Sequence, residues 1–135
     1  MIVEDAIKAF KKSPTNSFTI FLFHGVVKEF NDKNTVTNYN NKHIDSKRFK
    51  FFLKKISSIG DSISMDDICE IIVKKKKITN RAFAITFDDG FENNIQIAAP
   101  FLLNLKIPFT IYITTKFVDE NEMSWVDKID YAADK

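Results

Sequence analysis

An uncharged run at positions 82–87, in which large and small side chains alternate, is the clearest pattern along the chain. Phenylalanine and isoleucine occupy one face of this run, and alanine and threonine occupy the other. A strand with no charge on either face is typical of a parallel sheet that is covered on both sides. The run ends at Asp88, Asp89 and Gly90, and the glycine allows the tight turn that we expect to follow the strand.

Two further strands and several helices are predicted from patterns of the same kind. Apolar runs predict strands at 17–23 and 109–113. Because strands alternate with helices, we expect an α/β fold with a parallel sheet. Apolar residues that recur at three- and four-residue intervals predict helices at 3–12, 46–60, 64–73, 93–105 and 125–133.

The ends and faces of these helices give more local expectations. Ser46 is expected to cap the second helix, and Ser64 with Asp67 resembles a capping box in which aspartate replaces glutamate. Pro100 should kink its helix or start a new one. Four apolar residues are expected to be buried, three of them against the sheet: Ile97, Phe101 and Leu105, with Cys69 as a small core residue.

Composition narrows the class of protein. The 135 residues suffice for one domain, and 44% apolar with 28% charged residues is typical of a soluble globular protein. A net charge of +2 is too small to indicate nucleic-acid binding. The single cysteine excludes an internal disulfide, and the apolar run at 18–23 is too short to span a bilayer. Since acids rather than bases stand near the N-terminus, no signal peptide is recognised and a cytoplasmic location is expected.

The acid pair after the central strand is the main candidate for chemistry. Two adjacent carboxylates at the mouth of a buried strand repel each other and are costly to desolvate. A divalent metal would resolve both problems, with one acid binding the metal and the other taking a proton from water. The alternative is a pair of turn-forming acids that cap the next helix. His24 and Thr114 also follow predicted strands, so all four residues are expected on one rim of the sheet.

Several ordered segments resemble the polysaccharide deacetylase family, also called the NodB homology domain or carbohydrate esterase family 4. The residues 86–94 (Thr-Phe-Asp-Asp-Gly-Phe-Glu-Asn-Asn) carry the resemblance most strongly, with support from 23–26, 99–102 and 107–110. The resemblance implies a distorted (β/α) barrel, of which about three parallel strands are present here. Residues 1–135 would then form the N-terminal part of a single domain.

The same resemblance implies a reaction and a set of roles. The reaction is metal-dependent removal of N-acetyl (or O-acetyl) groups from a carbohydrate, with Asp88 as the general base and Asp89 as a ligand of Zn²⁺ or a similar divalent ion. The partner is an acetylated glycan or amino sugar. His24, Thr114 and Trp125 are candidates to contact the substrate or to support the residues that do. The alternatives are a histidine hydrogen-bonded to backbone at a strand end, an ordinary strand-end threonine and a tryptophan that belongs to the core. His43, which follows the polar loop expected at 28–42, is expected to be an ordinary surface residue.

One departure from the family pattern leaves alternatives open. The family carries a histidine pair downstream of the third strand, which supplies two metal ligands, and this chain ends at Lys135 without it. We therefore expect little or no hydrolysis by the chain alone. A non-catalytic or complementing fragment, able to self-associate through an incomplete barrel edge, is the second interpretation. The third is a Mg²⁺-dependent phosphoryl-transfer domain, which the three scattered glycines disfavour because no phosphate-binding loop is present.

Overall fold

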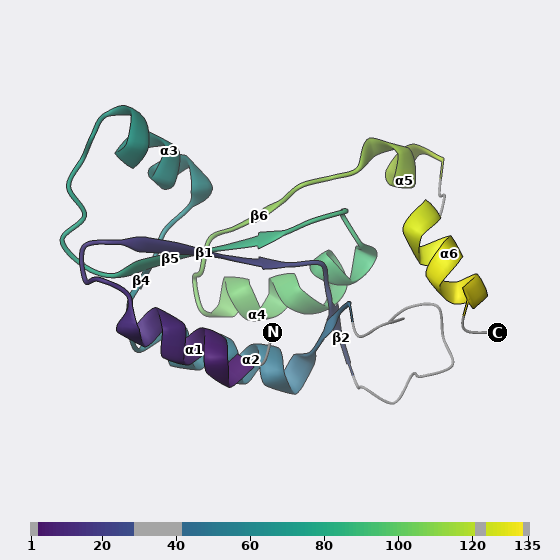
Figure 1. The fold of residues 1–135 in the computed structure, drawn as a ribbon, viewed down its shortest axis with the longest axis horizontal. Helices are drawn as coiled ribbons and strands as arrows, with labels where there is room; N and C mark the ends of the chain where they lie inside the picture. The colour runs from purple at the N-terminus through teal and green to yellow at the C-terminus, as the bar shows by residue number, and fades with distance from the viewer. Residues whose placement is uncertain (1–2, 29–41, 121–123, 134–135) are drawn as a thin grey trace.

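A computed structural model describes residues 3–28, 42–120 and 124–133 of the chain. Most of the loop expected at 28–42 therefore lies outside the described residues. The described elements form a parallel sheet with helices on both sides, of which α1, α2 and α4 lie on one side and α3 on the other (Figure 1). This arrangement confirms the predicted α/β fold class.

The sheet is built on the predicted central strand, β5 (Ala82–Phe87), all of whose residues are buried. β1 (Phe18–Phe23) pairs with it on one side, and β4 (Asp61–Ser62) and β6 (Phe109–Ile111) pair with it on the other. All of these pairings are parallel. The three predicted strands are confirmed, and the two-residue strand β4 was not predicted. A separate parallel pair joins β2 (Val26–Val27) to β3 (Ile44–Asp45).

The helices largely follow the predicted ranges. Within the described residues, no helix combines the length and the apolar character that crossing a membrane requires. The helices are α1 (Val3–Lys12), α2 (Ser46–Ser57), α3 (Met65–Val73), the π-helix η2 (Asn94–Ala98), α4 (Ala99–Asn104), α5 (Thr115–Asp119) and α6 (Trp125–Ala133).

An aromatic core fills the space between the sheet and helices α1 and α2. The rings meet mostly edge to face, as in the pair of Phe21 and Phe52, whose centroids lie 4.9 Å apart at an interplanar angle of 87°. This geometry places the positive edge of one ring against the negative face of the next. The core phenylalanines are Phe10, Phe21, Phe49, Phe52, Phe83 and Phe87.

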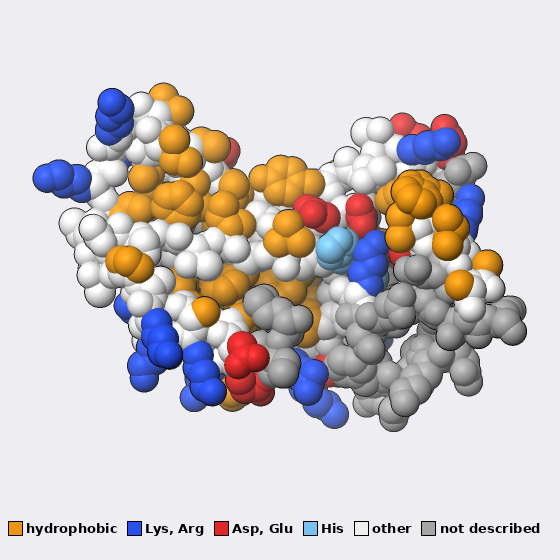
Figure 2. Space-filling model, viewed as in Figure 1, with side chains coloured by type: hydrophobic (Ala, Val, Ile, Leu, Met, Phe, Trp, Pro, Cys, Tyr) orange, Lys and Arg blue, Asp and Glu red, His pale blue; other side chains and the backbone are white. Residues whose placement is uncertain are grey.

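The opposite face of the sheet is less covered. Ile20 and Leu22 of β1 are exposed, because their side chains point away from the aromatic core. Their register partners on β5 are Ala84 and Thr86, which are small and buried. We call these four residues the open face. Hydrophobic side chains gather over α3 and the neighbouring strands in the space-filling view (Figure 2).

Of the two predicted helix caps, one is confirmed and the other is displaced. The capping box at Ser64 and Asp67 is confirmed, with both reciprocal hydrogen bonds present. The prediction that Ser46 caps α2 is wrong by one residue, because the Asp45 carboxylate accepts the N–H groups of Lys47 and Arg48 instead. Aspartate is as good an N-cap as serine, so the pattern alone does not choose between neighbours.

The prediction that Cys69 belongs to the core is also wrong. Cys69 is exposed, since α3 buries only Ile68 against the rest of the molecule. Ile72 and Val73 of the same helix are exposed too. An apolar helix can bury only the side that has a neighbour, and the described residues leave most of α3 without one.

The segment after Gly90 is helical, but its buried face differs from the prediction. Ile97 and Phe101 are only partly buried and Leu105 is exposed, whereas Ala98 and Leu102 are buried. The cause is the π-helix, in which the N–H of Ala99 donates to the carbonyl of Asn94, five residues back. The extra residue in this turn moves the buried face forward by one position. As predicted, a new helix starts around the proline: α4 begins at Ala99, and Pro100 lies in its first turn.

Candidate active site

The carboxyl ends of β1 and β5 are joined by a hydrogen bond from the Asp88 N–H to the carbonyl of Phe23, at 2.9 Å. His24 therefore follows β1 beside the two acids that follow β5. Acidic side chains, a histidine and a basic side chain lie close together between the sheet and α6 (Figure 2). We call this region the rim: His24, Lys42, His43, Asp88, Asp89 and Thr114.

Asp89 has a left-handed backbone, with φ at 71°, and Gly90 has the same φ. Aspartate is one of the few non-glycine residues that tolerate this conformation. The turn aims its carboxylate at groups from two other segments. Lys42 Nζ lies 3.0 Å from Asp89 Oδ2, and the hydroxyl of Thr114 donates to Asp89 Oδ1 over a long 3.5 Å. The rim thus includes the predicted Thr114 and a lysine that was not predicted.

Lys42 has further partners besides Asp89. Its Nζ lies 3.5 Å from Asp127 Oδ2 on α6 and 4.8 Å from the centroid of the Phe91 ring. Only 24% of the Lys42 side chain and 23% of the Asp89 side chain are exposed. The ammonium group is therefore held between two carboxylates and an aromatic face, in a partly shielded position.

His43 is 4% exposed, so the prediction of an ordinary surface residue is wrong. The Asn93 amide lies 2.7 Å from its Nδ1, and its ring meets Phe91 edge to face at 4.7 Å. Burial is the main reason why the pKa of His43 is lowered to about 4, and the nearby Lys42 and His24 contribute to the same shift. His43 is therefore neutral at pH 7, and its unprotonated nitrogen can accept the Asn93 N–H.

Gly25 makes this packing possible. A β-carbon at this position would lie 2.3 Å from both Asn93 Oδ1 and His43 Nδ1, which is far too close for any side chain. Asn94, which is fully buried, completes the arrangement. In the amide orientation that satisfies both of its ends, Asn94 donates to the carbonyl of His24 at 3.1 Å and accepts the N–H of Phe91 at 3.3 Å.

Of the remaining predicted residues, His24 lies at the rim and Trp125 is exposed on α6. His24 is half-buried and lies near enough to His43 to contribute to the lowering of its pKa, so its side chain belongs to the rim. Trp125 is 72% exposed on α6, which shows that its interpretation as a core residue is wrong. Its neighbour on the same helix, Asp127, reaches the rim through Lys42. A role for Trp125 beside a sugar stays a prediction.

The expected zinc ion does not fit the residues that the structure describes. Within 3–28, 42–120 and 124–133, no group of three or more His, Cys, Asp and Glu side chains could hold a metal. Asp89, the expected ligand, has Lys42 on one carboxylate oxygen and Thr114 on the other. A structural or catalytic zinc site needs at least three protein ligands.

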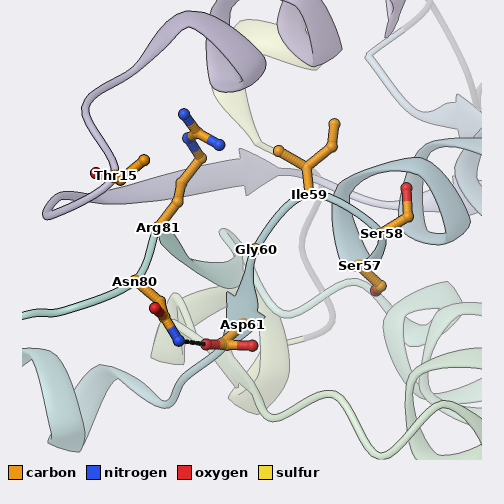
Figure 3. A pocket seen from close by; sticks show the side chains of 8 residues that line it. All are labelled: Thr15, Ser57, Ser58, Ile59, Gly60, Asp61, Asn80 and Arg81. Atoms are coloured by element: carbon orange, nitrogen blue, oxygen red, sulfur yellow. Dashed lines mark hydrogen bonds between the residues drawn. The ribbon is translucent and has the colours of Figure 1, made fainter.

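A polar depression of about 330 Å³ lies at the opposite end of β5 (Figure 3). Arg81 on its wall points toward α1, and its Nη2 donates to the carbonyl of Ser13, the residue after that helix, at 2.6 Å. Asn80 donates to Asp61 at 3.0 Å, as the dashed line shows. None of the predicted site residues lies there. Its lining consists of Thr15, Ser57, Ser58, Ile59, Gly60, Asp61, Asn80 and Arg81.

Comparison with known proteins supports the fold. No family model and no curated protein matches the chain. Three chains of solved structures match it, among them a de-N-acetylase from Aggregatibacter actinomycetemcomitans, with a TM-score of 0.61 and 18% identity. The match covers 76% of this chain and 39% of that protein, so the chain spans well under half of its length. The chain thus shares the α/β fold of the matched part of that protein.

Proposed function

We propose that this chain is part of a carbohydrate de-N-acetylase domain and carries the general base of that domain, Asp88. One observation carries the assignment of roles between the two acids. Lys42 neutralises Asp89, whereas none of the described residues pairs with or hydrogen-bonds to the half-buried Asp88 carboxylate. Asp88 is therefore the carboxylate left to accept a proton.

The proposed reaction is hydrolysis of the acetamide of an amino sugar. Asp88 takes a proton from the water that attacks the acetyl carbonyl, and the bond between carbonyl carbon and nitrogen then breaks. The proton passes to the leaving nitrogen, which gives the free amine and acetate. Neutral His43 is held in place by Asn93 and Phe91. It would support the side of the rim where the sugar binds.

We propose that the whole domain depends on a metal, although the described residues of this chain do not form a metal site. Zn²⁺, when bound in such enzymes, activates water and stabilises the oxyanion. The described residues supply the base and one carboxylate that is already paired, and therefore no metal site. A lone general base contributes about 10²- to 10⁴-fold to a rate, so we expect hydrolysis by this chain to be slow.

A non-catalytic or complementing part of such a domain is the second candidate. Two observations favour it: the pairing of Asp89 with Lys42, and the exposed apolar side chains of Ile20 and Leu22 on the open face. In this case the chain would bind an acetylated glycan without hydrolysing it, or would pair with a polypeptide that covers the open face.

The experiment measures glycan binding and acetate release together, with N-acetylglucosamine oligosaccharides as the probe. The variant is Asp88→Asn, and the matched control is Asp66→Asn, which makes the same change at an exposed acid in the first turn of α3. We expect binding by all three proteins and slow acetate release that Asp88→Asn abolishes and Asp66→Asn keeps. Binding without release by the unmodified chain supports the second candidate. Failure to bind acetylated glycans overturns both.

A further inference from the structure

The cation at the rim is supplied by the chain itself. We propose that Lys42 is the resident cation of this site: its ammonium group occupies the position beside Asp89 in which a divalent metal would have to bind. The rim then binds divalent cations weakly for as long as Lys42 stays in place. This inference goes beyond the proposed function, because it concerns which cation Asp89 holds and not whether a glycan is hydrolysed.

Three side chains surround the ammonium group, two from the turn after β5 and one from α6. Asp89 follows β5 and lies 3.0 Å from Nζ, and Asp127 of α6 lies 3.5 Å from it. The face of Phe91 lies on a further side, with its centroid 4.8 Å away. Two carboxylates and an aromatic face are the surroundings that a bound cation favours. Lysine suits the position because its ammonium is a compact charge with three donors.

Both oxygens of Asp89 are already engaged in this arrangement. Oδ2 accepts from Lys42, and Oδ1 accepts from the hydroxyl of Thr114. Metals bind carboxylate oxygens at about 2.0–2.6 Å. An ion at that distance from Oδ2 would lie close to the Lys42 ammonium, and the two like charges would repel each other. Binding a metal through Asp89 therefore requires Lys42 to leave.

Shielding distinguishes this contact from an ordinary surface ion pair. Exposed ion pairs are screened by salt and often contribute little. Here about three quarters of each side chain is covered, since Lys42 is 24%, Asp89 23% and Asp127 22% exposed. The ion pair of Lys116 and Glu120 on α5, with 62% and 55% exposure, shows the contrasting surface case. Competition between the ammonium and a metal is therefore only partly screened.

The test is a calorimetric titration of the full chain with Zn²⁺ and with Mn²⁺. The variant is Lys42→Met, which removes the charge, and the control is Lys47→Met, which makes the same change at an exposed position on α2. We expect the unmodified chain and the control to bind weakly and Lys42→Met to gain about tenfold or more in affinity, from the loss of like-charge repulsion. Adding Asp89→Asn to Lys42→Met should remove the gain.

Three results would overturn the proposal: tight one-to-one binding by the unmodified chain, no gain in Lys42→Met, or a gain that survives the loss of the Asp89 charge. Circular dichroism of each variant checks that it folds. If Lys42→Met unfolds, Lys42→Gln removes the charge while keeping a side chain that can donate to Asp89, and the same outcomes apply. Because the readout is metal affinity, the result is independent of acetate release.

Discussion

The aromatic core and the rim lie at different parts of the same strands and are held together in different ways. The core joins α1, α2, β1 and β5 through large apolar rings, so the packing energy is distributed over many contacts. The rim joins the ends of strands to the residues just before β3 through single polar contacts, such as that of the Asn93 amide with His43. A change in the core therefore alters stability through the side-chain volume that it adds or removes. A change at the rim alters stability through the loss of individual polar contacts or charges.

Truncating a core ring should have the largest effect. Phe52 is 1% exposed and its ring contacts those of Phe21 and Phe23. Phe52→Ala should lower the free energy of unfolding by about 3–5 kcal/mol, since it removes apolar contacts and leaves a cavity. Urea denaturation followed by circular dichroism measures the loss. The adjacent Phe51, which is 45% exposed, offers a matched control: Phe51→Ala should cost less than about 1 kcal/mol. Equal losses would contradict the assigned core.

Acid should act on the rim through His43. The pKa of His43 is about 4 in the folded chain and 6.5 ordinarily. Between these pH values the unfolded chain therefore binds a proton at His43 and the folded chain does not. Stability should therefore be full above pH 6.5 and fall towards pH 4, by up to about 3 kcal/mol from this residue. Denaturation at several pH values measures the slope. His43→Asn should flatten it, whereas His24→Gln should keep most of it; an unchanged slope in His43→Asn would refute the burial of a neutral histidine.

A single methyl group should disturb the rim. Gly25→Ala places a carbon where Asn93 and His43 already lie, so those side chains must move. We expect a loss of about 1–3 kcal/mol, as for other overpacked sites. Gly90→Ala is the comparison, because its β-carbon would approach Ile113 no closer than 3.4 Å and the cost there comes from the backbone. In NMR spectra, the His43 ring signals should shift in Gly25→Ala and stay in place in Gly90→Ala.

The open face should give the smallest change in stability. Ile20→Lys and Leu22→Lys replace exposed side chains on the strand that also supplies Phe21 to the core. We expect the free energy of unfolding to change by less than about 0.5 kcal/mol. If a second copy of the chain is the polypeptide that covers this face, self-association should decrease in sedimentation velocity. A loss of stability as large as that of Phe52→Ala would mean that this face is covered as well.

The contrast also explains which parts could be predicted from the sequence. β1, β5 and β6 are uncharged and apolar, so local pattern fixed them to within two residues at either end. β4 has two residues, one of them an exposed aspartate, and it exists because it pairs with the start of β5. Short-range patterns carry no information on such pairings.

The rim could be predicted only in part. Asp88, Asp89, His24 and Thr114 follow strands, so the shared edge of a parallel sheet brings them together. Lys42 and His43 come from a polar segment without periodicity, and nothing nearby in the sequence indicates that they reach Asp89 and Asn93. Gly25, directly after His24, was the available signal, because a glycine there leaves room for another segment. Trp125 shows the converse: an apolar side chain is buried only where another element covers it.

The left-handed turn at Asp89 restricts which residues the chain can carry there, independently of any reaction. In this conformation most side chains with a β-carbon cost about 1–2 kcal/mol, and glycine, asparagine and aspartate are the main exceptions. The turn alone therefore favours one of these three residues at position 89, although Lys75 and Lys106 show that the chain also holds lysine in this conformation. Aspartate at position 89 is therefore a poor indicator of activity by itself, and Asp89→Ala would change the backbone and the charge at once. Asparagine separates the two, because it keeps the turn and removes only the charge.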